Sequence, residues 1–436
     1  MSFLVLGLNH RTAPLELRER LAVEKEQLGP SLEQLRQYAG QGVVLSTCNR
    51  LEVYSFGDAN GEAEGSAQLR RFLSDNSGVS DGELAPHLYS YQEGDCVRHL
   101  FRVAAGLDSM VVGERQILGQ VRSAFSVASQ QQPVGGPLSR LFHQALRAGR
   151  RVHRETAIGG NSRSVSRAAV ELARRRLGDL ASRRVLVIGA GDAGRLVAQA
   201  LADAGARQIV VTNRTHSRAE ELARDLGGVS APFADLPQQL IEADVVISST
   251  GAPGYVLDRA GIVQAVRQRD GKPLLLIDIA VPRDIDPDAA GLPQVQLYDI
   301  DALQSVAEVS SPDGGLGQDV AHAERIVAEE TERFLEWWRS MDAVPVIAAV
   351  RQQAEALRHA EVERTLRILE RHWRQDGTQP EMDHLARRLD AMTTALVNKL
   401  LHYPTVRLKE MDDTARQELA RQLFNLDGDH DHQNRQ

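Results

Sequence analysis

A cysteine and an arginine stand close together in a short polar stretch between two apolar runs of the sequence. Residues 43–45 precede the stretch Ser-Thr-Cys-Asn-Arg at 46–50, and residues 51–56 follow it. If the apolar runs are strands, Cys48 and Arg50 lie at the lip of a sheet, where α/β and α+β proteins often place reactive side chains. Cys48 could be a nucleophile there, or a small buried hydrophobic side chain, which is the usual role of a cysteine.

A nucleophilic cysteine must be accessible, and a nearby cation must lower its pKa. By residue type the candidates are Arg50 and His99, the latter on a helix expected over 97–105. His99 could instead be a hydrogen-bonded histidine of that helix, and Cys96, the second of two cysteines, is expected to be structural. So few cysteines exclude a disulfide framework and suit a reducing, cytoplasmic setting.

A glycine-rich loop forms the second candidate site. It follows an apolar strand at 184–188 and opens a helix reaching 204, so its G-x-G-x-x-G spacing has the context of a dinucleotide-binding unit. The glycines allow a tight turn and a close approach to a diphosphate, and the helix N-terminus offers free N–H groups. A purely structural turn is the alternative. The expected cofactor-binding residues of the loop are Gly189, Ala190, Gly191, Asp192, Ala193 and Gly194.

The end of the next strand indicates which dinucleotide is bound. NAD enzymes usually place an acidic side chain there to hold the ribose 2′-hydroxyl. In this chain Asn213 and Arg214 follow the strand 208–212, with Arg218 nearby. A guanidinium suits a 2′-phosphate, so the sequence favours NADPH as the cofactor.

The chain divides into three regions and a tail, giving an α/β multidomain protein. We expect an N-terminal α+β domain over 1–155, a Rossmann-type domain over 156–300 and an all-helical region over 301–425, then a disordered tail over 426–436. The helical region has apolar positions at helical spacing and no chemistry, which is typical of a dimerisation module. Elsewhere the spacing predicts a helix over 15–38, a strand over 87–91, and strands over 245–248 and 274–279. Pro345 could kink the long helix or start a new one.

The charge distribution is uneven. The net charge of −8 gives no overall basic character, but residues 140–184 contain twelve arginines and only three acids. Such a block can meet phosphate, or it can be a set of solvated helix faces. No run approaches the roughly 20 apolar residues of a membrane span, and no cluster has the spacing of metal ligands.

A thiol in a chain that also holds a hydride donor suggests one reaction class. The thiolate attacks an activated acyl group, and the thioester is then reduced to an aldehyde. Several motifs, taken together, resemble those of glutamyl-tRNA reductases. They are residues 46–50, 106–114 (GLDSMVVGE), 116–120 (QILGQ) and 189–194, extended by 9–14 (NHRTAP), 280–285 (AVPRDI) and 399–405 (KLLHYPT).

The resemblance implies an NADPH-dependent enzyme that converts glutamyl-tRNA to glutamate-1-semialdehyde and releases tRNA, the first step of the five-carbon route to tetrapyrroles. It also implies a V-shaped homodimer formed through the C-terminal helices. The arginine-rich block would then face tRNA, and a glutamate-1-semialdehyde aminotransferase is a further expected partner.

Residue by residue, the resemblance implies that Cys48 is the nucleophile and that His99 is important for activity. Arg50 would pair with a substrate carboxylate, for which its planar fork is suited. Arg115 departs from the proline or small residue usual in the family, which leaves its backbone as the expected contact. The implied substrate-binding residues are Thr47, Asn49, Arg50, Ser109, Glu114, Arg115, Gln116 and Gln120.

Two other functions fit parts of the sequence. One is an NADP-dependent dehydrogenase of small metabolites similar to shikimate dehydrogenases, which share the Asn-Arg-Thr at 213–215 and need no cysteine. The other is a non-catalytic protein that binds tRNA or the aminotransferase, although the presence of Cys48, Arg50 and His99 argues against it. A Cys48→Ser variant discriminates, because only a thioester enzyme depends on the thiol.

Overall fold

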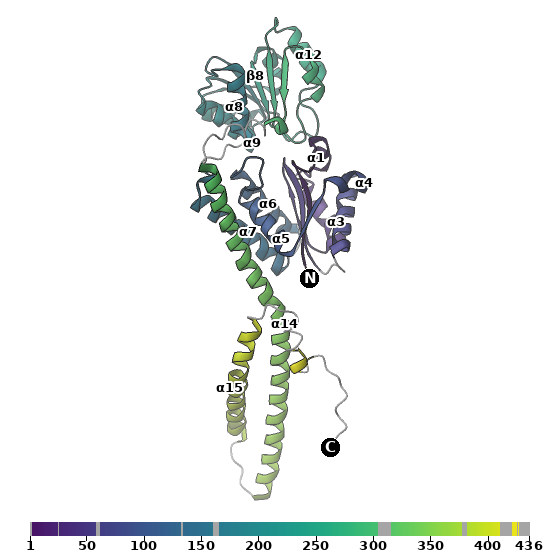
Figure 1. Cartoon of the computed structure of the whole chain (residues 1–436), viewed down its shortest axis with the longest axis vertical. Helices are drawn as coiled ribbons and strands as arrows, with labels where there is room; N and C mark the ends of the chain where they lie inside the picture. Colours follow the sequence, from purple (N-terminus) through teal and green to yellow (C-terminus); the bar gives the residue numbers. More distant parts are fainter. Residues whose placement is uncertain are drawn as a thin grey trace. The chain divides into compact units, whose positions relative to one another are not determined.

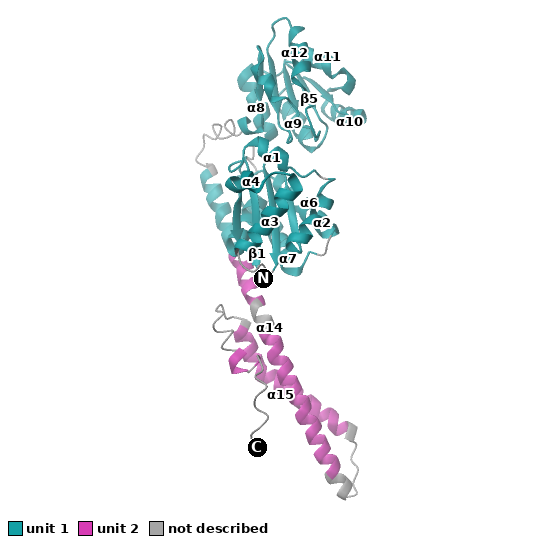
Figure 2. Ribbon diagram, turned by 90° about the vertical axis from the view of Figure 1, so that its right-hand side faces the viewer, with its two compact units in different colours: residues 1–331 teal, residues 332–436 magenta. Residues whose placement is uncertain are grey.

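The structure is a computed structural model. The residues described are 2–24, 26–57, 62–131, 134–159, 165–303, 315–376, 382–409, 421–424 and 426. They fall into two compact units, residues 1–331 and 332–436, which are coloured separately in Figure 2. The expected tail lies outside the described residues except for Leu426. Within the described ranges, no helix combines the length and the apolar character needed to cross a bilayer.

The N-terminal domain is built on an antiparallel sheet with the strand order β2-β3-β1-β4. Helices lie on both sides of it, with α5, α6 and α7 on one side and α3 on the other (Figure 1). Because both faces are covered, β1 and β3 are buried along nearly their whole length. The strands are β1 (Ser2–Asn9), β2 (Gly42–Ser46), β3 (Arg50–Gly57) and β4 (Tyr89–Gln92). The helices are α1 (Leu15–Leu21), α2 (Leu28–Ala39), α3 (Glu62–Ser77), α4 (Asp81–Leu84), η1 (Ala85–His87), α5 (Glu93–Ala104), α6 (Gln116–Gln131), α7 (Gly136–Glu155) and η2 (Ala157–Gly159).

The helix expected over 15–38 is in fact two helices, α1 and α2. Ala22 leaves the helical conformation with ψ 126°, and its N–H still bonds to the Glu19 carbonyl. The next N–H, that of Val23, donates to the Ser46 hydroxyl at 3.0 Å. This bond holds Val23 at the end of β2, a position that a continuous helix would not reach. The strand expected over 87–91 lies slightly later, at β4.

The second domain contains a six-stranded parallel sheet in the order β10-β9-β8-β5-β6-β7. The first strand, β5, is central, and the chain reverses direction across the sheet between β5 and β8, which is the Rossmann arrangement. The predicted fold class is confirmed. The elements are α8 (Val165–Leu177), β5 (Arg184–Ile188), α9 (Asp192–Asp203), β6 (Gln208–Thr212), α10 (His216–Leu226), β7 (Val229–Ala231), η3 (Phe233–Asp235), α11 (Leu236–Glu242), β8 (Val245–Ser248), α12 (Arg259–Arg267), β9 (Leu274–Asp278), η4 (Pro287–Gly291) and β10 (Val295–Tyr298).

Alternate residues of β5 belong to two separate apolar cores. Val185 and Val187 pack with α8, α9 and α10, whereas Leu186 and Ile188 pack with α11 and α12. Side chains on a strand alternate between faces, so a strand covered on both faces must be apolar throughout. This two-sided burial explains why residues 185–188 (VLVI) form an unbroken apolar run.

The C-terminal region consists of α14 (Gly315–Asp376) and α15 (Met382–Lys409). α14 continues through position 345, so no new helix begins at the proline there. In the second unit, Arg358 of α14 pairs with Asp390 of α15 at 2.5 Å. Several large apolar side chains are exposed in this unit, as expected of a surface that meets another subunit. They are Leu357, Ile368, Met392, Leu396, Leu400 and Tyr403.

Candidate active site

Thr47, Cys48 and Asn49 form the turn between β2 and β3. The Thr47 hydroxyl accepts from the backbone N–H groups of Asn49 and Arg50, each at 3.2 Å, so its side chain stabilises the turn itself. Asn49 is only 8% exposed, and its Oδ1 has no hydrogen-bond partner among the described residues. A buried acceptor without a partner is costly, so this oxygen is suited to a ligand donor.

Cys48 is half-buried at the tip of this turn. Its side chain packs against a small apolar cluster made of Leu15, Met110 and Ile300, and Val281 packs against the same cluster. Leu15 and Met110 belong to the N-terminal domain, whereas Val281 and Ile300 follow strands of the Rossmann sheet. The thiol therefore lies where the two domains of the first unit meet.

The Cys48 thiol is protonated at neutral pH in this arrangement. Burial raises its pKa to about 12, the Glu114 carboxylate adds to the rise, and the guanidiniums of Arg18 and Arg50 oppose it. The expectation of a lowered pKa is wrong for this structure, because loss of hydration outweighs both cations. Cys48 must lose part of this cover before it can act as a nucleophile.

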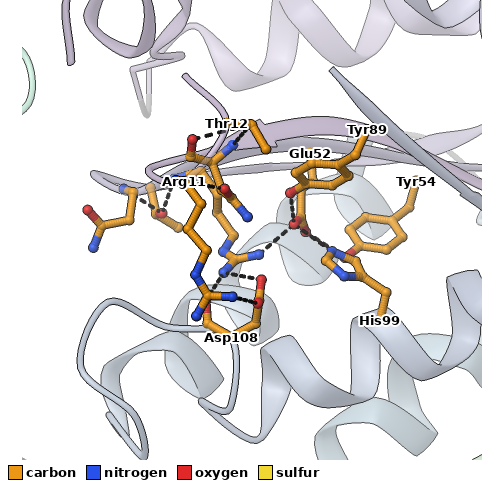
Figure 3. A network of polar contacts seen from close by, with 11 residues as sticks. Arg11, Thr12, Glu52, Tyr54, Tyr89, His99 and Asp108 are labelled. Carbon is orange, nitrogen blue, oxygen red and sulfur yellow. Dashed lines mark hydrogen bonds and ion pairs between the residues drawn. The ribbon is translucent and has the colours of Figure 1, made fainter. Parts of the chain in front are cut away.

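The buried carboxylate of Glu52 accepts hydrogen bonds from several side chains near the turn (Figure 3). Its Oε1 accepts from Arg50 Nη1 at 2.6 Å, from the Tyr89 hydroxyl at 2.5 Å and from His99 Nε2 at 2.8 Å. Its Oε2 accepts from the Tyr54 hydroxyl at 2.6 Å. Burial opposes ionisation, but Arg50 and His99 together hold the pKa of Glu52 well below its usual range. Glu52 is thus an ionised hub with no exposed surface.

His99 uses Nε2 for Glu52, so that nitrogen must carry a proton. Its ring also lies against Tyr91, with 4.8 Å between centroids. Among the described residues its hydrogen bond goes to Glu52 and not to Cys48. Cys96, one turn earlier on α5, is 1% exposed, and burial followed by Glu52 raises its pKa well above the usual value.

Arg50 joins β3 to the loop 106–114. Its guanidinium, in a residue only 2% exposed, donates to the Asp108 carboxylate at 3.0 Å and also to the Asp108 backbone carbonyl. Asp108 takes a further bond from Arg11 at 3.1 Å. The role of Arg50 as a partner for a substrate carboxylate stays a prediction, since in this structure its donors serve Glu52 and Asp108.

The loop 106–114 carries Ser109, which is 6% exposed, and Glu114, whose pKa burial raises to about 7. The loop closes through a bond from Gly113 N–H to the Gly106 carbonyl at 2.9 Å. Gly113 has φ +86°, and a Cβ there would lie 2.2 Å from the Ile158 carbonyl oxygen. Only glycine fits this position, which brings Glu114 back toward the Cys48 turn.

Arg115, Gln116 and Gln120 follow the loop. Arg115 and Gln116 are exposed, and Gln120 lies one turn further along α6, on the same face as Gln116. In the described structure no hydrogen bond ties these three side chains to the Cys48 turn, so their substrate role stays a prediction.

His10 is a polar group beside the turn that sequence reasoning missed. Its N–H donates to the Asn49 carbonyl at 2.9 Å, and neither ring nitrogen has a partner among the described residues. Burial, followed by the nearby charge of Arg11, lowers the pKa of His10 to about 4, so the ring is neutral near pH 7.

The glycine loop fits a dinucleotide. A Cβ on Gly189 would lie 2.7 Å from the Ser249 carbonyl oxygen, and one on Gly194 would lie 2.0 Å from the Gly189 carbonyl oxygen. These two glycines are required by close backbone packing. Gly191 has open space in the same direction, which leaves the backbone accessible to a diphosphate.

The remaining predicted cofactor residues surround this loop. Asn213 Oδ1 accepts from the Ala190 N–H at 3.2 Å, so the end of β6 is tied to the loop. Asp192 and Ala193 form the first turn of α9, whose N–H groups are available to phosphate. Arg214, like Arg218, is exposed, and no acidic side chain in the described ranges pairs with either. The structure therefore joins Asn213 to the glycine loop, and Arg214 follows it in the sequence with no hydrogen bond to the loop in the described structure, so its role stays a prediction.

Two further residues that sequence reasoning missed are Glu52 and Arg18. Glu52 had a signal, because a carboxylate two positions after Arg50 on a strand lies on the same face. Arg18 had none. It binds the Cys48 carbonyl 30 residues away and the Asp301 carboxylate 283 residues away, and only the fold creates these contacts.

Comparison with known proteins places the whole chain. Residues 6–156 match the family model for the N-terminal domain of glutamyl-tRNA reductase, and residues 322–426 match that for its dimerisation domain. Residues 171–306 match the shikimate/quinate 5-dehydrogenase model, which supports a nicotinamide cofactor in the Rossmann domain.

Relatives that align with nearly the whole chain are also named glutamyl-tRNA reductase. The glutamyl-tRNA reductase of Syntrophotalea carbinolica is 44% identical, covering 98% of this chain and 95% of that protein. That of Geobacter sulfurreducens is 43% identical, covering 98% and 96%. The solved glutamyl-tRNA reductase of Methanopyrus kandleri has 32% identity and a TM-score of 0.49, covering 98% of this chain and 99% of that one. From its identity to relatives over nearly its whole length, the chain belongs to the glutamyl-tRNA reductase family.

Proposed function

We propose that this enzyme reduces glutamyl-tRNA to glutamate-1-semialdehyde with NADPH, through a thioester on Cys48. The observation that carries the proposal is a cysteine at the tip of the β2–β3 turn, packed against residues that follow the Rossmann strands. A mechanism that acylates a thiol and then reduces the product needs that thiol close to the hydride donor, and this packing supports such a position.

In the proposed first step the Cys48 thiolate attacks the carbonyl carbon of the glutamyl ester. The bond from that carbon to the ribose oxygen breaks, and tRNA leaves with its hydroxyl reprotonated. Asn49 Oδ1 is placed to accept a hydrogen bond from the substrate, since it has no partner within the described chain. Bound NADPH would supply the hydride that reduces the thioester, after which the C–S bond breaks and the aldehyde leaves.

The roles of the other side chains follow from their surroundings. Ser109 and Glu114 lie on the loop that Arg50 ties to β3 through Asp108, and Glu114 is close enough to Cys48 to raise the pKa of the thiol. Arg115, Gln116 and Gln120 would extend the substrate surface along α6. His99 would act from a position fixed by Glu52, because its Nε2 proton is already committed.

NADPH is the proposed form of the cofactor. Arg214 and Arg218 are exposed after β6, where a 2′-phosphate would lie, and neither has an acidic partner in the described part of the chain. Arginine matches phosphate geometry, and residues 213–218 (NRTHSR) include no carboxylate that could bind a free 2′-hydroxyl.

The domain roles form part of the same proposal. We assign catalysis to residues 1–155, NADPH binding to 156–300 and homodimer formation to 301–425, and the ranges matched by the family models support this division. A tRNA-facing surface would include the exposed arginines of α7. A glutamate-1-semialdehyde aminotransferase is the partner we propose for the reactive aldehyde. The exposed α7 arginines are Arg140, Arg147, Arg150 and Arg154.

The proposal is tested by NADPH oxidation with purified glutamyl-tRNA. Cys48→Ser should abolish turnover, whereas Cys96→Ser, which changes the second and fully buried thiol, should retain it. The match to shikimate/quinate 5-dehydrogenases favours one alternative, a small-metabolite dehydrogenase. Turnover of shikimate that survives Cys48→Ser would establish that alternative and refute the thioester mechanism.

A further inference from the structure

Arg18 of α1 is a buried cation bound directly to the backbone of the proposed nucleophile. Its Nη1 donates to the Cys48 carbonyl at 2.9 Å and its Nε to the Ala13 carbonyl at 3.3 Å. Its Nη2 donates to the Asp301 carboxylate, which is its single charged partner in the described structure. Two of the three contacts thus lie in the N-terminal domain, and the one that neutralises its charge comes from just beyond β10.

The two members of this ion pair differ in their access to water. The Arg18 side chain is 2% exposed, whereas that of Asp301 is 37% exposed. Asp301 can exchange Arg18 for water at little cost, but Arg18 stays held by two backbone carbonyls. The compensation of the Arg18 charge therefore depends on where residue 301 lies.

The same docking also covers the thiol. Ile300, the neighbour of Asp301, packs in the apolar cluster that Cys48 contacts, and so does Val281. Two residues after Val281, Arg283 pairs with Glu19 of α1 at 2.8 Å. Arg283 also pairs with Glu16 at 3.2 Å, so α1 receives charged contacts from the Rossmann side through Arg18, Glu19 and Glu16.

We propose that Arg18 is a positioning residue that couples domain docking to the reactivity of Cys48. While Asp301 pairs with Arg18, the thiol is covered and the charge of Arg18 is neutralised. When Asp301 withdraws, the Arg18 guanidinium remains at the Cys48 carbonyl and stabilises the thiolate. The coupling rests on the proposed function, in that it activates the thiol when the domains part to admit the tRNA ester.

The other charges around the thiol do not depend on docking in this way. Glu114, on the loop, raises the pKa of Cys48, whereas Arg18 and Arg50 lower it. Arg50 is compensated by Glu52 and Asp108, which both belong to the N-terminal domain. Among the cations that act on Cys48, Arg18 is the one whose partner comes from the Rossmann side.

The test measures alkylation of Cys48 by iodoacetamide at pH 7, in full-length protein without tRNA or NADPH. A Cys96→Ser background leaves one thiol to report. Asp301→Asn keeps the shape and an acceptor oxygen but removes the charge, so alkylation should accelerate. A tenfold gain in thiolate, offset by its lower nucleophilicity, gives about a threefold faster rate for each unit by which the pKa falls.

Matched variants make the outcome decisive. Arg18→Gln should slow alkylation and Arg18→Lys should restore most of it, while Arg20→Gln, on the same helix but in an exposed pair with Glu83, should change nothing. An unchanged rate in Asp301→Asn would overturn the proposal. So would an equal acceleration by Asp301→Asn in the Arg18→Gln background, because Asp301 would then act without Arg18. Neither result depends on reductase activity, which the assay of Cys48→Ser tests separately.

Discussion

Replacing Glu52 by glutamine tests whether one buried charge holds the candidate site together. Glu52 has no exposed surface and pairs with Arg50 at 2.6 Å. Glutamine keeps the shape and one acceptor oxygen but leaves the buried Arg50 guanidinium with Asp108 alone. Breaking a buried ion pair by removing one partner costs about 3–5 kcal/mol. Since Asp108 remains, we expect the lower end, about 3 kcal/mol.

Hydrogen–deuterium exchange of full-length protein measures the lost stability of the N-terminal domain, through peptides that cover β1 and β3. A loss of about 3 kcal/mol lowers the protection of these amides by about a hundredfold, because 1.4 kcal/mol corresponds to a factor of ten. Glu83→Gln is the matched control. Glu83 pairs with Arg20 on the surface, with side chains 45% and 51% exposed, so its loss should be below about 1 kcal/mol.

A second variant separates the charge from the packing. Adding Arg50→Met to Glu52→Gln removes the uncompensated cation, so the double variant should recover part of the lost protection. If Glu52→Gln loses no more protection than Glu83→Gln, or if the double variant loses the full sum of both changes, the account of Glu52 as an ionic hub is refuted.

Three further predictions follow from the site. Glu114→Gln removes the carboxylate that, after burial, most raises the pKa of Cys48, so above pH 7, where this carboxylate is ionised, alkylation of Cys48 should quicken about threefold; an unchanged rate would contradict this. Arg214→Ala with Arg218→Ala should raise the KM for NADPH by about tenfold or more while leaving NADH unaffected, because charged hydrogen bonds to phosphate are lost. Burial raises the pKa of Asp278 to about 8, against about 4 in the unfolded chain. The native state therefore binds this proton more tightly and loses stability as pH rises from about 4 to about 8. Asp278→Asn should flatten that slope in the exchange of β9 amides between pH 5 and pH 9.

The parts of the site that the sequence predicted are those specified locally. The glycine loop, the end of β6 and the cysteine turn each lie within one strand–turn unit, so spacing alone placed Gly189, Asn213 and Cys48 correctly in the fold. The protonation state of Cys48 was not predictable in this way. It depends on Ile300 and Glu114, which the chain reaches only by folding.

The break between α1 and α2 also depends on a contact between residues that are far apart in the sequence. Apolar spacing continues across residues 22–27, and only the bond from Val23 to Ser46 of β2 shows why the helix ends. Long-range polar contacts of this kind leave no periodic signal. They are also the contacts that carry the coupling between Arg18 and Cys48.

The proposed mechanism requires Cys48 to carry the glutamyl group, and this thioester can be trapped. Full-length protein is mixed with glutamyl-tRNA in the absence of NADPH and examined by intact-protein and peptide mass spectrometry. If the thioester forms on Cys48, one glutamyl group is found on the peptide that contains this residue. The adduct should be absent from the Cys48→Ser variant, and adding NADPH should convert it to free aldehyde. An aldehyde formed by Cys48→Ser, or a glutamyl adduct on Cys96 in its place, would contradict this mechanism.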